Sequence, residues 1–120
     1  MPSHSSQVPE DRAPSSSERG LIKWLLEHAR PGASQFIPQL EALRVMSHCA
    51  CGCASINFVG FELSAAVEIL ADYKWQDDAG PRFGIMLFQK AGVLAGLEVY
   101  SIDGEGIPMA LPNVAWLIPV

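Results

Sequence analysis

The sequence predicts an α+β fold in which two N-terminal helices pack on an antiparallel β-meander of about four strands. Apolar residues recur every three or four positions before the cysteine cluster at residues 49–53, and they alternate with polar residues after it. Short stretches of turn-forming residues join the alternating segments, which favours neighbouring antiparallel strands. A chain of 120 residues with 49% hydrophobic side chains is suited to one hydrophobic core.

Residues 1–16 are expected to form a flexible leader, and residues 17–120 a single α+β domain. The leader holds three prolines and five serines but only one aliphatic residue, Val8. Such a composition buries too little apolar surface to offset the entropy lost on ordering.

Two helices are predicted after the leader. Ser15 and Glu18 have the spacing of a capping box, and the apolar face that follows ends at Pro31-Gly32. Ser34 is the expected N-cap of the second helix, in which Pro38 lies near the first turn. The apolar positions of the two helices are Leu21, Ile22, Trp24, Leu25, Leu26 and Ala29, then Phe36, Ile37, Leu40 and Leu43.

Four strands are predicted from the alternating pattern, at residues 55–59, 67–75, 83–89 and 93–101. The third is apolar on both faces and is expected to be central. Gly96 in the fourth indicates a bulge or a close backbone approach. A helix is the alternative for residues 61–75, because their alanines and leucines also fit helical spacing.

The C-terminal segment, residues 107–120, has three prolines and no charged side chain. It is predicted to be extended and to close the core as an edge strand. The alternative is an exposed apolar patch that binds a protein partner or a second copy of the chain.

The three cysteines, Cys49, Cys51 and Cys53, fall within five consecutive residues and are the main candidates for chemistry. Their thiolates suit Zn²⁺, with His48 as the adjacent fourth ligand and His28 or His4 as more distant ones. The same thiols also suggest a redox role, or simple packing as small buried side chains. The chain has no Cys-x-x-Cys motif, and no partner that would orient His48 is identifiable, so no catalytic residue is predicted.

The formal charge of −5 and the absence of a Lys/Arg cluster argue against nucleic acid or an anionic membrane as a partner. No signal-like segment or long apolar run is present, so a cytoplasmic protein with reduced thiols is expected.

The chain resembles a family of small uncharacterised bacterial proteins. In these, two helices precede a Cys-x-Cys-Gly-Cys motif, here residues 49–53, and a strand like Ser55-Ile56-Asn57-Phe58 follows it. A Leu-Glu-Val segment, here residues 97–99, and a proline-containing finish at Leu111-Pro112 complete the similarity, which covers residues 18–113. Relatives often have proline where this chain has Ala54. The resemblance implies the architecture and a bacterial cytosol, but no activity.

The sequence therefore suggests a non-enzymatic binding or interaction domain without a cofactor. Its partner would be another protein or a second copy of the chain. The alternative is a zinc-binding or thiol-redox protein that acts through Cys49, Cys51 and Cys53.

Overall fold

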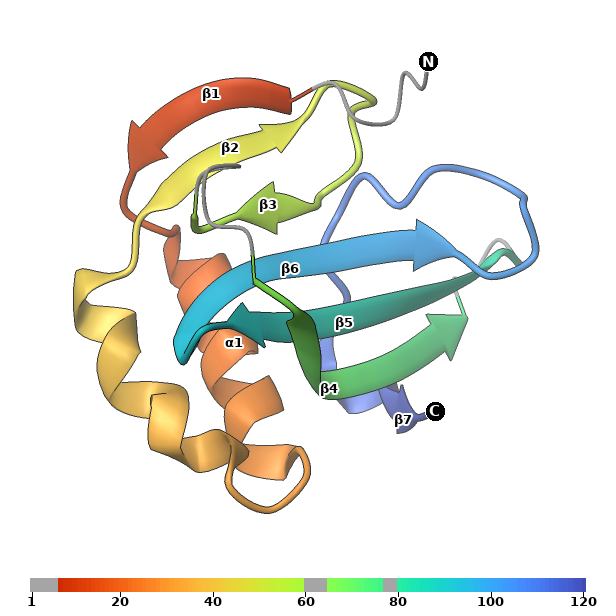
Figure 1. The fold of residues 1–120 in the computed structure, drawn as a ribbon. Helices are drawn as coiled ribbons and strands as arrows, with labels where there is room; N and C mark the ends of the chain where they lie inside the picture. Colours follow the sequence, from red (N-terminus) through yellow and green to blue (C-terminus); the bar gives the residue numbers. More distant parts are fainter. Residues whose placement is uncertain (1–6, 60–64, 77–79) are drawn as a thin grey trace.

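The computed structural model describes residues 7–59, 65–76 and 80–120, which form one antiparallel sheet with helices packed on one of its faces (Figure 1). The elements in chain order are β1 (Gln7–Arg12), α1 (Ser16–His28), the 3₁₀ helix η2 (Ala33–Ala42), β2 (Val45–Cys49), β3 (Ile56–Asn57), β4 (Val67–Gln76), β5 (Arg82–Lys90), β6 (Val93–Ser101), the 3₁₀ helix η3 (Val114–Trp116) and β7 (Ile118–Pro119).

The seven strands of the described residues lie in the order β1-β2-β3-β6-β5-β4-β7. The predicted architecture was wrong in two respects, because the sheet exceeds four strands and because the helices follow β1 instead of preceding every strand. Residues 7–12 of the expected flexible leader form β1, which pairs with β2 at the sheet edge. An edge strand depends on backbone hydrogen bonds more than on apolar side chains. The polar residues 7–12 therefore lack the alternation of apolar and polar positions from which a strand is predicted.

Helix α1 begins as predicted. The Ser15 hydroxyl accepts the Glu18 backbone N–H at 3.1 Å, and the Glu18 carboxylate accepts the Ser15 N–H at 2.8 Å, which completes the capping box. The second helix differs from the prediction, because Gly32 in the left-handed region (φ 91°) precedes it and Ser34 is not its cap. Pro38 lies within η2, which has 3₁₀ geometry.

Three of the predicted strands are confirmed in position. Residues 67–76 form β4, so the strand interpretation of that stretch holds, while residues 61–64 lie outside the described residues. β5 is central, between β4 and β6. The strand expected over residues 55–59 is reduced to the two residues of β3.

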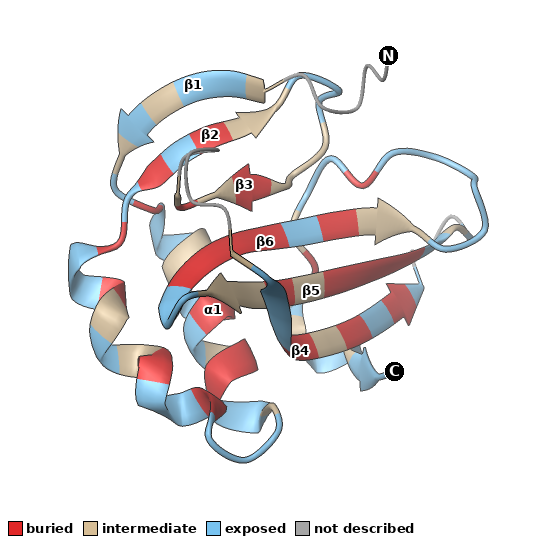
Figure 2. Cartoon of the chain, viewed as in Figure 1, coloured by how far each residue is buried: buried red, intermediate tan, exposed pale blue. Residues whose placement is uncertain are grey.

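The core lies between α1 and the inner face of the sheet (Figure 2). The largest fully buried side chains come from α1, β2, β5 and β6: Ile22, Leu25, Leu26, Val45, Ile85, Leu87, Leu94 and Leu97. These side chains hold β6 in place. β6 in turn pairs with β3, the strand that follows the cysteine loop.

On the outer face of the sheet, the Phe88 ring lies over Gly96. A Cβ atom added at Gly96 would lie 2.4 Å from the Phe88 Cζ atom, so only glycine permits this arrangement. The close approach predicted at Gly96 is therefore confirmed.

The C-terminal segment forms the edge strand β7, in which Ile118 pairs with Lys74 and Pro119 with Tyr73. Leu111, Val114 and Leu117 are partly buried against the core. The edge-strand prediction is confirmed for residues 118–119.

No helix in the described ranges is both long enough and apolar enough to cross a membrane.

Replacing Leu25 with alanine should lower the free energy of unfolding by about 2–5 kcal/mol, because it leaves a cavity beside a side chain with 0% exposure. Val67→Ala is the control, since Val67 is 54% exposed, and should change stability little. Urea denaturation measures both. Equal losses in the two variants would contradict the position of the core described above.

Candidate metal centre

The three cysteines lie on the loop between β2 and β3. Cys49 is the last residue of β2, and residues 50–55 return the chain to Ile56. Gly52 has a φ of 92°, a left-handed conformation that glycine adopts without strain, and its N–H lies 3.5 Å from the Cys49 carbonyl oxygen. The chain therefore reverses within the cluster itself.

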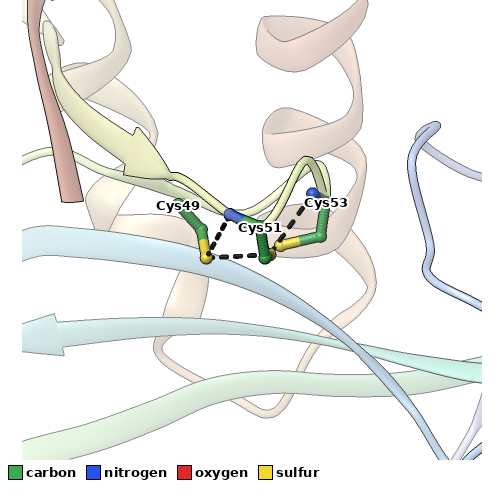
Figure 3. Close-up of side chains that lie close together, drawn as sticks. All are labelled: Cys49, Cys51 and Cys53. Carbon is green, nitrogen blue, oxygen red and sulfur yellow. Dashed lines mark hydrogen bonds between the residues drawn. The ribbon is translucent and has the colours of Figure 1, made fainter. Parts of the chain in front are cut away.

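This reversal brings the three sulfurs together (Figure 3). The Sγ atoms all lie within 4.8 Å of one another, and those of Cys49 and Cys51 are 2.8 Å apart. The backbone N–H groups of Cys51 and Cys53 donate to the sulfurs of Cys49 and Cys51, each at 3.4 Å. Thiolates on one tetrahedral zinc ion, with Zn–S bonds of about 2.3 Å, lie roughly 3.8 Å apart. Small side-chain rotations reach that spacing, so the group can hold a metal ion such as zinc.

The cluster is open to solvent. Cys51 is exposed, while Cys49 and Cys53 are half-buried, and all three are free cysteines. Cys53 packs against the hydrophobic core, whereas Cys51 is exposed, so the packing interpretation does not account for the whole cluster. Cys49 and Cys53 also line a cavity of about 260 Å³ on the outer face of the sheet, together with Gln7, Ser55, Asn57, Phe88 and Glu98, among others.

The end of the loop that leads into β3 is held by hydrogen bonds. The Ser55 hydroxyl accepts the Val99 N–H at 2.9 Å and donates to the Val99 carbonyl oxygen at 3.2 Å. The Ala54 N–H donates to the Pro108 carbonyl oxygen at 2.9 Å. These contacts fix the cysteine loop against β6 and the segment after it.

The two described histidines, His28 and His48, lie outside the sulfur group, although His48 lines a second cavity, of about 340 Å³, together with Cys53. His48 precedes Cys49 on β2, so its side chain points to the opposite face, where Nδ1 lies 2.5 Å from the Glu10 carboxylate. His28 stacks on Trp24 with ring centroids 4.2 Å apart. His4 lies outside the described residues. The metal-competent group in the described part of the chain consists of the three thiols, without His48.

Glu10, the partner of His48, belongs to a charged network that sequence reasoning missed. Arg12 donates to Glu10 at 2.9 Å and to both carboxylate oxygens of Glu18 at 2.9 and 3.1 Å. The hydrogen bond from His48 contributes most to lowering the pKa of Glu10, and Arg12 lowers it further. Arg12 likewise lowers the pKa of Glu18, and both carboxylates raise the pKa of Arg12. The network therefore ties β1 and His48 to the start of α1.

Comparison with known proteins gives no assignment. No family model, no curated protein and no solved structure matches this chain. The resemblance to the bacterial family stays a prediction, and the function of the thiol cluster has to be inferred from its own geometry.

The charged network should make stability depend on pH. The pKa values of Glu10 and Glu18 are lowered in the folded protein. Their stabilisation is therefore complete above the ordinary glutamate pKa of about 4.3 and is lost as the pH falls through the folded values. Arg12→Gln should be less stable than the wild type at pH 7 and should lose less stability between pH 5 and about pH 3.

Urea denaturation at several pH values measures this difference. Arg44→Gln is the matched control, because Arg44 pairs with Asp11 in a solvent-exposed contact at 3.0 Å. Its stability should follow the wild-type pH profile. If Arg12→Gln also ran parallel to the wild type, the network would not be the source of the pH dependence.

Proposed function

We propose that the protein binds a zinc ion through the thiolates of Cys49, Cys51 and Cys53. The observation that carries the proposal is the convergence of the three Sγ atoms to within 4.8 Å of one another. Sulfur ligands select Zn²⁺ or soft ions such as Cu⁺ over Mg²⁺ and Ca²⁺. The backbone N–H groups on two of the sulfurs would offset negative charge on the metal-bound thiolates.

Three thiolates leave one position of a tetrahedral zinc ion open. Because Cys49 and Cys53 line the outer-face cavity, this position is accessible from there. The bound ion would act as a Lewis acid and would tie β2 to β3. A reducing compartment such as the cytoplasm suits the proposal, since it keeps the thiols available to the metal.

The thiol-redox alternative uses the same atoms in a different way. The Cys49 and Cys51 sulfurs form the nearest pair, at 2.8 Å. A peroxide would accept two electrons and two protons from these two thiols and be reduced to water or an alcohol and water, and the resulting disulfide would remove two of the three ligands, so metal binding and disulfide formation exclude each other. Zinc analysis of the reduced, anaerobically purified protein therefore separates the two functions.

The wild-type protein purified without oxygen should contain about one zinc ion per chain, and Cys51→Ser should contain less than about 0.1. The zinc dissociation constant of the variant should rise by more than about 100-fold, because outer-shell changes alone cost 10–100-fold. Elemental analysis and competition with a chromophoric chelator measure the two quantities.

Cys51 is exposed, so its replacement should leave the circular dichroism spectrum unchanged. His48→Gln examines the predicted four-ligand set separately. Retention of zinc would place His48 outside the site, whereas a loss equal to that of Cys51→Ser would make it a ligand. Wild-type protein without bound zinc, Cu⁺ or iron would refute the metal-binding function.

A second candidate function is association through the C-terminal segment. Apolar side chains there remain accessible, with Met109 and Val120 each 71% exposed, Ile118 57% and Trp116 48%. Exposed apolar groups of this size are typical of surfaces that bind another protein or a second copy of the chain.

If a second copy covers this segment, light scattering coupled to size-exclusion chromatography should give the mass of a dimer. The variant Trp116→Ser should shift it towards 13.0 kDa, the mass of one chain. Val67→Ser, also at an exposed apolar position, is the control and should not change the mass. A monomeric wild type that captures no protein from its native extract would exclude the interaction function.

A further inference from the structure

We infer that the carboxylate of Glu98 is the fourth ligand of the metal ion held by Cys49, Cys51 and Cys53. This inference rests on the proposed zinc function, and it completes the coordination shell that the three thiolates leave open.

The strand register places Glu98 in line with Cys49. Ser47 on β2 pairs with Asn57 on β3, which pairs with Gly96 on β6. The last paired row is His48, Ile56 and Leu97, and Cys49 and Glu98 are the next residues of β2 and β6 beyond it. Side chains repeat every second residue within a strand, so Cys49 on β2 and Glu98 on β6 project to the face of Ser47 and Gly96, the outer face of the sheet.

The outer-face cavity independently brings the same groups together. Its wall includes Cys49 and Cys53 from the thiol cluster and Glu98 from β6. Glu98 is exposed, and within the ranges that the structure describes it takes part in no salt bridge. The Glu98 carboxylate lies outside the group of three sulfurs within 4.8 Å of one another, so a rotation of its side chain would bring it to a cation in that cavity.

The distance between the two strands suits a shared ion. Neighbouring strands are about 4.8 Å apart, so Cys49 and Glu98 are separated by roughly 10 Å at their Cα atoms. A cysteine and a glutamate side chain span this distance when one zinc ion joins them, with bonds of about 2.3 Å to sulfur and about 2.1 Å to oxygen. Ser55 lies between them, and its short side chain is turned onto the backbone of Val99.

An oxygen ligand also bears on which metal is preferred. A carboxylate is a hard ligand, whereas Cu⁺ prefers sulfur alone. Three thiolates with one carboxylate should therefore favour Zn²⁺ over Cu⁺ more strongly than three thiolates without it.

The test measures zinc affinity by chelator competition in the wild type, Glu98→Gln and Glu98→His. Glu98→Gln should raise the zinc dissociation constant by at least about tenfold, because an amide is a poor zinc ligand. Glu98→His should restore affinity close to that of the wild type, because imidazole binds zinc at a similar reach without a negative charge. Glu41→Gln is the control, since Glu41 is exposed on η2 and has the same change of charge.

Cobalt(II) substitution supplies a second readout. In Glu98→Gln the thiolate-to-cobalt charge-transfer absorption should persist, while the ligand-field bands should change with the loss of the carboxylate. Zinc affinity equal to that of Glu41→Gln, with unchanged cobalt bands, would overturn the role of Glu98 and leave the thiolate site intact. Equal weakening in Glu98→Gln and Glu98→His would also overturn it, because it would show a charge effect only. Absence of metal from the wild type would overturn both proposals.

Discussion

The pairing of β3 with both β2 and β6 is the constraint on which the sheet and the cysteine cluster depend. Ile56 and Asn57 are the only residues of β3, and each pairs with one residue on either side. Buried Ile56 anchors the strand to the core, and the Asn57 amide donates to Gln7 at 2.8 Å and to the Ser47 hydroxyl at 3.2 Å. Because the strand is so short, these side-chain bonds add to the backbone pairing that joins β1 and β2 to the meander.

The same pairing explains why the thiols converge. β2 ends at Cys49 and β3 starts at Ile56 in the neighbouring antiparallel strand, so residues 50–55 have to reverse direction over one strand spacing. The left-handed Gly52 supplies the turn, and the Ser55 hydroxyl holds its far end on the Val99 backbone. In the proposed site, a zinc ion would cross-link this reversal and add its binding free energy to folding.

The two-residue period of β2 separates the histidine from the thiols. Cys49 projects to the outer face, whereas His48 projects to the side where Glu10, Arg12 and Glu18 form their network. Two features that are neighbours in sequence thus have different roles. The charged network links β1 and His48 to the start of α1, and the outer-face cavity is lined by Cys49, Cys53 and Glu98.

The sequence by itself determined the local features: the capping box of α1, the strands near 67–75, 83–89 and 93–101, the close approach at Gly96, and the grouping of the thiols. Each depends on residues close together in the chain, where periodicity and turn chemistry act directly. Only the tertiary structure decided that polar residues 7–12 form a strand, that His48 bonds to Glu10, and that Glu98 lines a cavity with Cys49 and Cys53. These outcomes follow from backbone pairing between segments about 40 residues apart, as between Gln7 and Cys49, and such pairing leaves no periodic trace in either segment.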